Sequence, residues 1–160
     1  MRLELFFDEI EAELSAIKFP LSYRQITLET KRPEGFILGL TRHRYKQTIH
    51  VSKFTDKFND LYMLVCGLMK EFAPDFEFTS IQVNKNIMCK PHKDSWNKGD
   101  SVIFALGTYS NGGELVICSV PYDIKRNPLL FNGGKNTHWV NDWEFGDRYT
   151  ITCYNILTSN

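Results

Sequence analysis

The chain has 160 residues, of which 42% are hydrophobic and 14% aromatic, and its 19 basic and 19 acidic residues leave no net charge. This length and composition allow a proper hydrophobic core, which excludes disorder as a description of the whole chain. Zero net charge predicts neither a nucleic-acid nor a membrane partner, so a charged binding surface has to be local. We expect one domain over residues 1–160, with a helical and mixed support region over 1–77 and a core barrel over 78–157.

The N-terminal segment predicts an amphipathic helix. Apolar residues recur at helical spacing from Leu3 to Ile17 with acidic residues between them, and Pro20 is expected to end the helix. The interrupting acids and the lack of a small-residue cleavage site argue against a secretory signal. No stretch reaches the roughly 18 to 20 apolar residues that a membrane span needs. We therefore expect an intracellular, cytoplasmic protein without a membrane partner.

A second helix is predicted over residues 55–72 by a broad apolar stripe, and Pro74 is expected to end it. Between the two helices, short strands are predicted over residues 23–28, 36–40 and 48–51. The surrounding stretch, residues 24–57, carries a local excess of basic side chains. Such a stretch beside an active site can follow a phosphate backbone, and the same pattern is also typical of an ordinary solvated surface.

From residue 78 onward the pattern changes to strands. The predicted strands are residues 78–84, 100–109, 113–120, 128–131, 137–140 and 148–157. Glycine-containing turn sequences separate several of them, at 111–113, 132–134 and 145–147. Segment 100–109 is apolar on both faces, so we expect both of its faces to be covered. Short strands separated by such turns are typical of a β-barrel.

The cysteines indicate a reducing environment. Cys66, Cys89, Cys118 and Cys153 lie far apart and form no Cys-x-x-Cys pair. This spacing argues against a zinc ribbon and against a redox dithiol. We expect buried free thiols, which agrees with an intracellular location.

Two segments, KPHKDSW and NTHWVNDWEFGDRYT, hold the residues most typical of chemistry. His92 and Asp94 are two positions apart, so in an extended chain their side chains point to one side and can reach one ion. His138 has to join them from a neighbouring strand. Two imidazoles and one carboxylate can hold Fe(II) on one octahedral face and leave the opposite positions open.

Arg148 begins the last predicted strand. A guanidinium is the side chain best shaped to bind a carboxylate through two parallel hydrogen bonds. Alternate strand residues share a face, which gives one face with Arg148, Thr150, Thr152 and Tyr154 and another with Tyr149, Ile151 and Cys153. The sequence therefore predicts a metal and a dicarboxylate that are bound together.

This arrangement resembles the Fe(II)- and 2-oxoglutarate-dependent dioxygenases, whose signature is His-x-Asp, a distal His and then Arg. The resemblance implies a mainly β fold with flanking helices (α+β), namely a double-stranded β-helix, or cupin-like jelly roll, with two helices packed on the major sheet. It implies that His92, Asp94 and His138 bind Fe(II). Arg148 then binds the far carboxylate of 2-oxoglutarate, assisted by Thr150. The implied reaction hydroxylates an unactivated C–H bond, consumes O2 and 2-oxoglutarate, and releases succinate and CO2.

Within that superfamily, one group is most similar to the segments VNKNIMCKPHKD, ALGTYSNGGELVI and FNGGKNTHWV. It comprises compact viral, phage and algal oxygenases near the ten-eleven-translocation and base-J-type thymine or methylcytosine hydroxylases. The similarity covers residues 78–157 and implies a nucleobase methyl group in DNA or RNA as substrate. Alkylation-repair dioxygenases fit less well because Tyr154 replaces their second arginine. Prolyl hydroxylases usually have Lys at the position of Arg148.

Other interpretations remain open. The basic stretch 24–57 could contact nucleic acid while Tyr45, Trp96 or Trp139 stacks on an extruded base. The substrate could instead be a peptide side chain or a small metabolite, or the chain could be a cupin-like binding module without catalysis. In the plainest alternative, His138 is a surface histidine and Arg148 is a solvated strand residue. If another cation binds the carboxylate, the candidates are Arg126 and Lys135.

Overall fold

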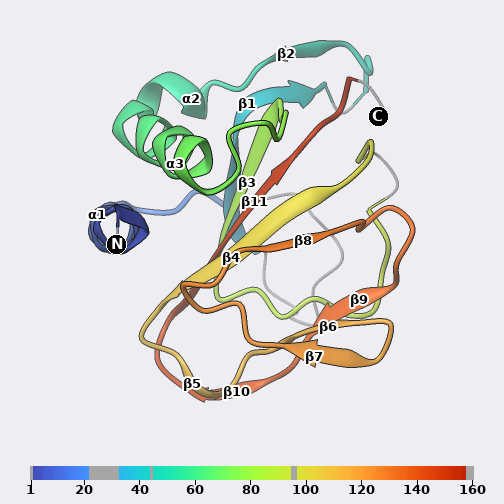
Figure 1. Cartoon of the computed structure of the whole chain (residues 1–160). Coiled ribbons are helices and arrows are strands. Elements are labelled where there is room, and N and C mark those ends of the chain that lie inside the picture. The colour runs from blue at the N-terminus through green and yellow to red at the C-terminus, as the bar shows by residue number, and fades with distance from the viewer. Residues whose placement is uncertain (1, 22–32, 44, 95–96, 158–160) are drawn as a thin grey trace.

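A large antiparallel sheet forms the centre of the computed structural model, which describes residues 2–21, 33–43, 45–94 and 97–157. The strand order is β2-β1-β3-β11-β4-β8. These strands are β1 Glu34–Arg42, β2 Ile49–Val51, β3 Ser80–Lys85, β4 Ser101–Gly107, β8 Leu129–Phe131 and β11 Arg148–Tyr154. Strand β3 pairs with β1 on one side and with β11 on the other (Figure 1). The large sheet therefore joins strands from the first half of the chain to the last strand.

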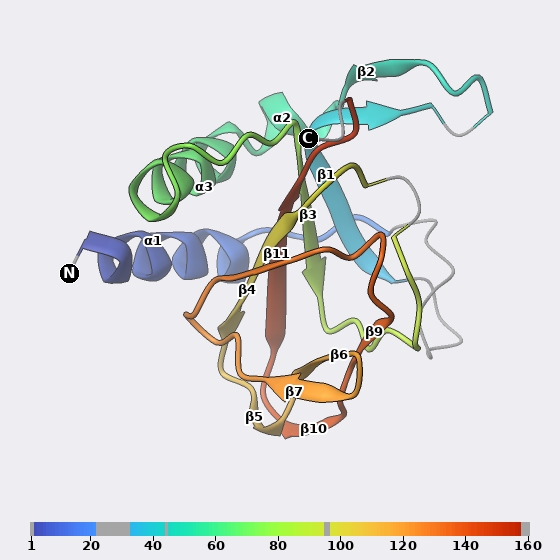
Figure 2. The same ribbon diagram turned by 45° about the vertical axis from the view of Figure 1, so that its right-hand side comes forward.

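Two smaller antiparallel sheets complete the barrel. One has the order β7-β6-β9, and the other pairs β5 with β10. Their strands are β5 Ser110–Gly112, β6 Leu115–Ile117, β7 Val120–Tyr122, β9 His138–Val140 and β10 Trp143–Phe145. Both small sheets lie away from the helices, on the other side of the large sheet (Figure 2). The predicted class, mainly β with flanking helices arranged as a double-stranded β-helix, is confirmed.

Helices cover the remaining face of the large sheet (Figure 1). They are α1 Arg2–Ala16, α2 Phe54–Lys57 and α3 Asn59–Phe72. The rings of Phe7 on α1 and Phe104 on β4 meet edge to face, with centroids 5.6 Å apart. Burial of each such large apolar side chain contributes about 1.5 to 3 kcal/mol. The main core between helices and sheet also includes Ile10, Leu14, Leu61, Val65, Leu68, Met69, Ile81, Val83, Val102, Leu106, Tyr149, Ile151 and Cys153.

The central strands present different residues to their two sides. On β11, Tyr149 and Ile151 belong to the core under the helices, whereas Arg148 and Thr150 line a cavity inside the barrel. The predicted alternation of this strand is therefore confirmed. Strand β4 is apolar on both sides, as predicted, because Ile103 and its neighbours form a second, smaller core inside the barrel.

Two predicted elements are divided in the structure. The helix predicted over 55–72 is split into α2 and α3 at Phe58, where φ is −114° and ψ is 44°. The strand predicted over 113–120 is a hairpin, because Cys118 and Ser119 have positive φ values of 49° and 69°. Such a turn matches the twist of paired strands, but it is usually predicted from a sequence such as Asn-Gly. The sequence Cys-Ser gives no such signal, so the turn was not predicted. The strand predicted over 23–28 lies outside the described residues.

All four cysteines are free, as predicted, but the prediction that they are buried holds only for Cys153. Cys66 and Cys89 are half-buried, and Cys118 is exposed because it lies in the turn between β6 and β7. Burial raises the pKa of the Cys153 thiol, which lies in the core beneath the helices. Among the described residues, the helices are too short or too polar to cross a membrane.

Candidate metal and co-substrate site

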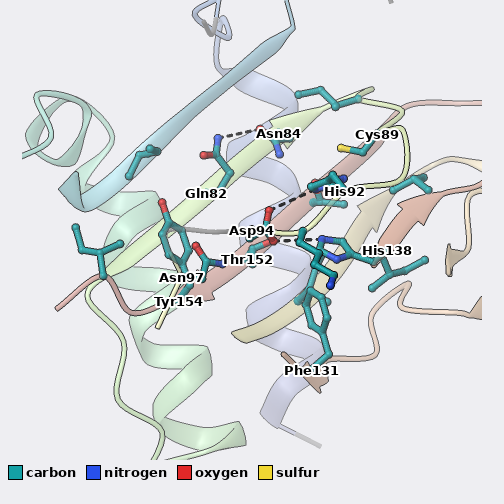
Figure 3. A pocket seen from close by; sticks show the side chains of 18 of the residues that line it. Gln82, Asn84, Cys89, His92, Asp94, Asn97, Phe131, His138, Thr152 and Tyr154 are labelled. Carbon is teal, nitrogen blue, oxygen red and sulfur yellow. Dashed lines mark hydrogen bonds and ion pairs between the residues drawn. The ribbon is translucent and has the colours of Figure 1, made fainter. Parts of the chain in front are cut away.

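Three side chains converge at one point inside the barrel (Figure 3). His92 Nε2 lies 3.3 Å from Asp94 Oδ1, and His138 Nε2 lies 3.2 Å from Asp94 Oδ2. All three ligand atoms are within 4.8 Å of one another. Ligands about 2.1 Å from an ion and at right angles to each other stand about 3 Å apart, so this spacing suits one octahedral face. The structure thus brings together the three residues predicted to bind a metal.

Backbone pairing brings the two histidines to each other. His92 and His138 lie opposite one another in an antiparallel bridge and exchange N–H to carbonyl hydrogen bonds of 3.1 and 3.0 Å. Their rings consequently meet, with centroids 4.3 Å apart. The N–H of Asp94 donates to the carbonyl of Gly133 at 2.8 Å, which fixes the loop that carries the carboxylate. The expectation that His138 joins from a neighbouring strand is confirmed.

Hydrogen bonds also decide which nitrogen of each ring faces the site. His92 Nδ1 lies 2.7 Å from the carbonyl of Lys90, and His138 Nδ1 lies 2.8 Å from the carbonyl of Asn136. Because a carbonyl can only accept, each Nδ1 carries a proton and donates it. Each Nε2 then points toward Asp94 as a ligand atom. Such outer hydrogen bonds orient metal-binding histidines and increase their basicity.

Asp94 is the anionic member of this candidate metal site. Burial raises the pKa of its carboxyl group, but His138 and His92 beside it outweigh burial and hold that pKa well below its usual range. The group is therefore ionised at neutral pH. Metal binding requires the deprotonated form, so the site is ready for a cation without first losing a proton from Asp94.

Arg148 forms the buried end of the same cavity and is only 2% exposed. Its Nε donates to the carbonyl of Gly113 at 3.1 Å. Its Nη2 has no hydrogen-bond partner, and the guanidinium forms no ion pair, within the described part of the chain. Desolvation lowers the pKa of this guanidinium, which still stays charged. Because a buried charge without a partner is costly, this end of the cavity is suited to an anion.

Tyr109, beside Arg148, was not predicted from the sequence. The guanidinium carbon of Arg148 lies 5.3 Å from the centre of the Tyr109 ring. The Tyr109 hydroxyl is buried and has no hydrogen-bond partner among the described residues. Gly113 makes this packing possible, because a Cβ there would stand 2.7 Å from the Tyr109 ring. Tyr109 lies between β4 and β5, whereas Arg148 begins β11, so only the folded chain shows that Tyr109 belongs to the site.

A cavity of about 710 Å³ joins the metal cluster to Arg148. This volume is in the range of small-molecule sites. Thr150, predicted to assist Arg148, lines the cavity at the next inward position of β11. Ile103, Leu115, Phe131 and Val140 give the cavity an apolar wall, and the β1–β2 hairpin contributes Arg42, His43 and Gln47.

The two alternative cations do not lie in this cavity. Arg126 forms ion pairs with Asp8 and Glu4 of α1, in the helical layer. Lys135 is exposed in the turn before β9. Of the three cations considered from the sequence, Arg148 alone lines the cavity that holds the metal cluster.

Solved structures share this architecture, among them the following three. NgTET1 in complex with 5mC DNA has a TM-score of 0.60 at 13% identity, covering 97% of this chain and 67% of that one. An oxidoreductase of the 2OG-Fe(II) oxygenase family from Burkholderia pseudomallei has a TM-score of 0.58 at 13% identity, covering 92% and 76%. A prolyl hydroxylase from Trichoplax adhaerens, in complex with a hypoxia inducible factor peptide, has a TM-score of 0.55 at 13% identity, covering 98% and 79%. No family model and no curated protein sequence matches the chain.

The chain therefore has the fold of the 2-oxoglutarate/Fe(II) oxygenases. Its own residues also fit Fe(II) and 2-oxoglutarate, the metal and the co-substrate in the name of that family. Two imidazoles and a carboxylate with open positions suit Fe(II). A buried guanidinium whose Nη2 has no hydrogen-bond partner among the described residues suits a carboxylate of 2-oxoglutarate. The predicted closeness to viral, phage and algal members stays a prediction.

Replacing His92, Asp94 or His138 with Ala should each remove most Fe(II) binding. Loss of one of three protein ligands leaves a site from which water and buffer can remove the ion. Anaerobic Fe(II) titration followed by calorimetry measures this directly. His50→Ala is the matched control, since His50 is exposed and lies outside the cluster. Undiminished iron binding in the three site variants would contradict the assignment.

Gly133→Ala should weaken metal binding while leaving the fold intact. A Cβ at residue 133 would stand 2.7 Å from Asp94 Oδ2, so the carboxylate has to move off its ligand position. Disturbing such support typically reduces metal affinity by about 10- to 100-fold. The neighbouring Gly134→Ala is the control, because its Cβ would approach no atom closer than 3.3 Å. Equal Fe(II) affinities of the two variants would show that Gly133 does not position Asp94.

Proposed function

We propose that the protein is an Fe(II)- and 2-oxoglutarate-dependent dioxygenase that hydroxylates a nucleobase methyl group in DNA or RNA. One observation carries the reaction class. A His–Asp–His cluster with converging ligand atoms opens onto one cavity together with a buried arginine that has no anionic partner among the described residues. A metal site or a buried arginine alone has many uses, whereas the two in one cavity match a metal chelated by a dicarboxylate.

Each site residue has a role in this proposal. His92, Asp94 and His138 hold Fe(II) on one face and leave the opposite positions open. Arg148 binds the far carboxylate of 2-oxoglutarate, and Thr150 assists it. When bound, iron and 2-oxoglutarate supply an oxidant for an unactivated C–H bond, with O2 consumed and succinate and CO2 released. These assignments follow the geometry of the chain and the family resemblance together.

The chain itself contributes orientation and exclusion of water. The Lys90 and Asn136 carbonyls keep both imidazoles turned toward the ion. The apolar wall of the cavity limits the water that can reach a reactive centre, which strengthens electrostatic interactions inside it. A fixed guanidinium holds the co-substrate in one orientation, so its other end is directed toward the metal.

Features of the cavity favour a nucleobase over other substrates. Trp139 lines it and offers an aromatic face on which an extruded base can stack. Asp94 is the single acidic residue among the described residues of the lining, whereas Arg42 and Lys93 are basic. Such a balance suits a substrate that carries phosphate. The similar structure of NgTET1 contains 5mC DNA.

The basic stretch 24–57 reaches the cavity only in part. Arg42 and His43, at the end of β1, line it. Lys53 and Lys57 belong to the helical layer, where each ammonium group lies over a neighbouring phenylalanine ring. Tyr45 on the hairpin is 82% exposed and does not line the cavity. Residues 22–32, Arg44 and Trp96 lie outside the described residues.

A peptide is the second candidate substrate. The similar prolyl hydroxylase from Trichoplax adhaerens holds a peptide of hypoxia inducible factor. In this chain, β2 forms one edge of the large sheet beside the cavity lining of β1, and its side chains are exposed. An exposed edge strand can pair with an extended peptide. A test of the substrate class therefore has to include peptides.

Arg148→Ala should reduce 2-oxoglutarate affinity by roughly two to three orders of magnitude, because it leaves a buried carboxylate without its cationic partner. Arg148→Lys should lose less, since the charge remains without the two-pronged geometry. Iron binding should survive in both variants. The measurement is the 2-oxoglutarate dependence of succinate formation, alongside an Fe(II) titration. Unchanged 2-oxoglutarate dependence in Arg148→Ala would mean that another residue binds the carboxylate.

Succinate release with methylated DNA, methylated RNA, free nucleotides and proline-containing peptides tests the substrate class. We expect methylated nucleic acid to stimulate release. Lys93→Glu should weaken nucleic-acid binding and reduce its salt slope by about 1, because one phosphate contact is lost. Lys70→Glu is the control, since Lys70 is exposed on α3 and outside the cavity lining. Stimulation by peptides alone would replace the nucleobase proposal with the peptide one.

A further inference from the structure

Two buried amides, Gln82 and Asn84, stand on the β3 wall of the cavity (Figure 3). They are 6% and 8% exposed. Gln82 Nε2 donates to the carbonyl of Phe36 at 3.2 Å and to Asn84 Oδ1 at 2.9 Å. Both protons of this nitrogen are thus used. Because the Phe36 carbonyl can only accept, the orientation of the Gln82 amide is fixed.

The two amides each keep one unused polar atom. Within the described residues, neither Gln82 Oε1 nor Asn84 Nδ2 has a hydrogen-bond partner. The first can only accept and the second can only donate. Gly35 makes room for this arrangement, since a Cβ there would stand 2.4 Å from Asn84 Oδ1. The wall therefore presents one acceptor and one donor, on two amides that hold each other in place.

Strand register places Gln82 beyond the level of the co-substrate. Asn84 pairs with Thr150, and Gln82 pairs with Thr152, four residues along β11 from Arg148. At about 3.3 Å per residue, Thr152 stands about 13 Å from Arg148. A five-carbon dicarboxylate anchored at Arg148 spans only about 5 Å between its end carbons. The level of Gln82 is therefore left for a second ligand, and Asn84, level with Thr150, lies at the boundary between that ligand and the co-substrate.

We propose that Gln82 and Asn84 recognise the hydrogen-bonding edge of the nucleobase that is oxidised, an inference that rests on the proposed function. Gln82 Oε1 accepts from a base N–H, and Asn84 Nδ2 donates to the adjacent acceptor of that base. Each nucleobase has an N–H next to an acceptor on its Watson–Crick edge, where flipped bases are recognised. A trans peptide group points its N–H and C=O in opposite directions, so it cannot match the pair on one edge.

Binding without turnover tests this assignment. The probe is a set of short single-stranded oligonucleotides, each with one central thymine, cytosine, adenine, guanine or abasic site, titrated into protein loaded with Mn(II) and 2-oxoglutarate. Gln82→Leu removes the acceptor. Asn84→Asp keeps the oxygen that accepts from Gln82 and replaces the unpaired donor on the cavity wall with an acceptor. Each variant should bind the preferred base about 10- to 100-fold more weakly and leave abasic binding unchanged.

Asn127→Ala serves as the matched control, since it removes an exposed amide outside the cavity lining. It should bind every probe as the unmodified protein does. Three results would overturn the inference: equal binding of all oligonucleotides including the abasic one, an undiminished base preference in both cavity variants, or tighter binding of an asparagine-containing peptide than of any base. Failure of the proposed function is distinguishable in both of its parts. A protein that is not an oxygenase of this class would bind neither Mn(II) nor 2-oxoglutarate in the loading step, and one that does not act on nucleic acid would load both and bind none of the oligonucleotides.

Discussion

The site depends on the central strands β3 and β11, each of which turns its apolar side chains toward the helices and its polar side chains toward the cavity. On β11, Tyr149 and Ile151 are held in the core beneath the helices, and this forces Arg148 and Thr150 into the barrel. A slip of one residue in the pairing would exchange the two sets, burying the polar ones under the helices and turning the apolar ones toward the cavity. The apolar contacts with α1 and α3 therefore fix the register, and the register fixes the site.

The cavity side of these strands carries polar groups that the described chain leaves unpaired. Arg148 Nη2 and Tyr109 Oη have no partner at the buried end. Buried groups of this kind reduce the stability of a fold unless something binds to them. The large apolar core on the other side of the sheet can offset that cost. Ligands that satisfy these groups should then bind the folded chain and stabilise it by mass action.

The metal cluster has a different structural origin. His92 and His138 meet because the segment before β4 pairs with β9, while Asp94 is tied to Gly133 through its backbone. The ligands thus sit on the smaller side of the barrel and Arg148 on the large sheet. A cofactor and a co-substrate that bind each other would join the two walls. Neither sheet alone therefore carries the complete site, which is formed by the cavity between them.

The sequence by itself determined the elements whose signals are local. Periodicity predicted the first helix and the two-faced last strand, and the His-x-Asp, His and Arg pattern named the residues that converge in the structure. Where tertiary contacts set the conformation, the prediction was wrong. The second helix breaks at Phe58, and the strand predicted over 113–120 turns back at Cys118 and Ser119.

Only the tertiary structure decided which distant residues share the site. Tyr109 reaches Arg148 across a close approach that Gly113 permits, and Gln82 and Asn84 face the cavity because β3 lies between β1 and β11. Spacing along a chain fixes which side chains share the face of one strand. It does not fix which strands become neighbours, since that depends on how the apolar faces of all elements are buried together. For that reason the sequence predicted the three candidate metal ligands and the arginine proposed to bind an anion, while the fold alone showed the residues around them.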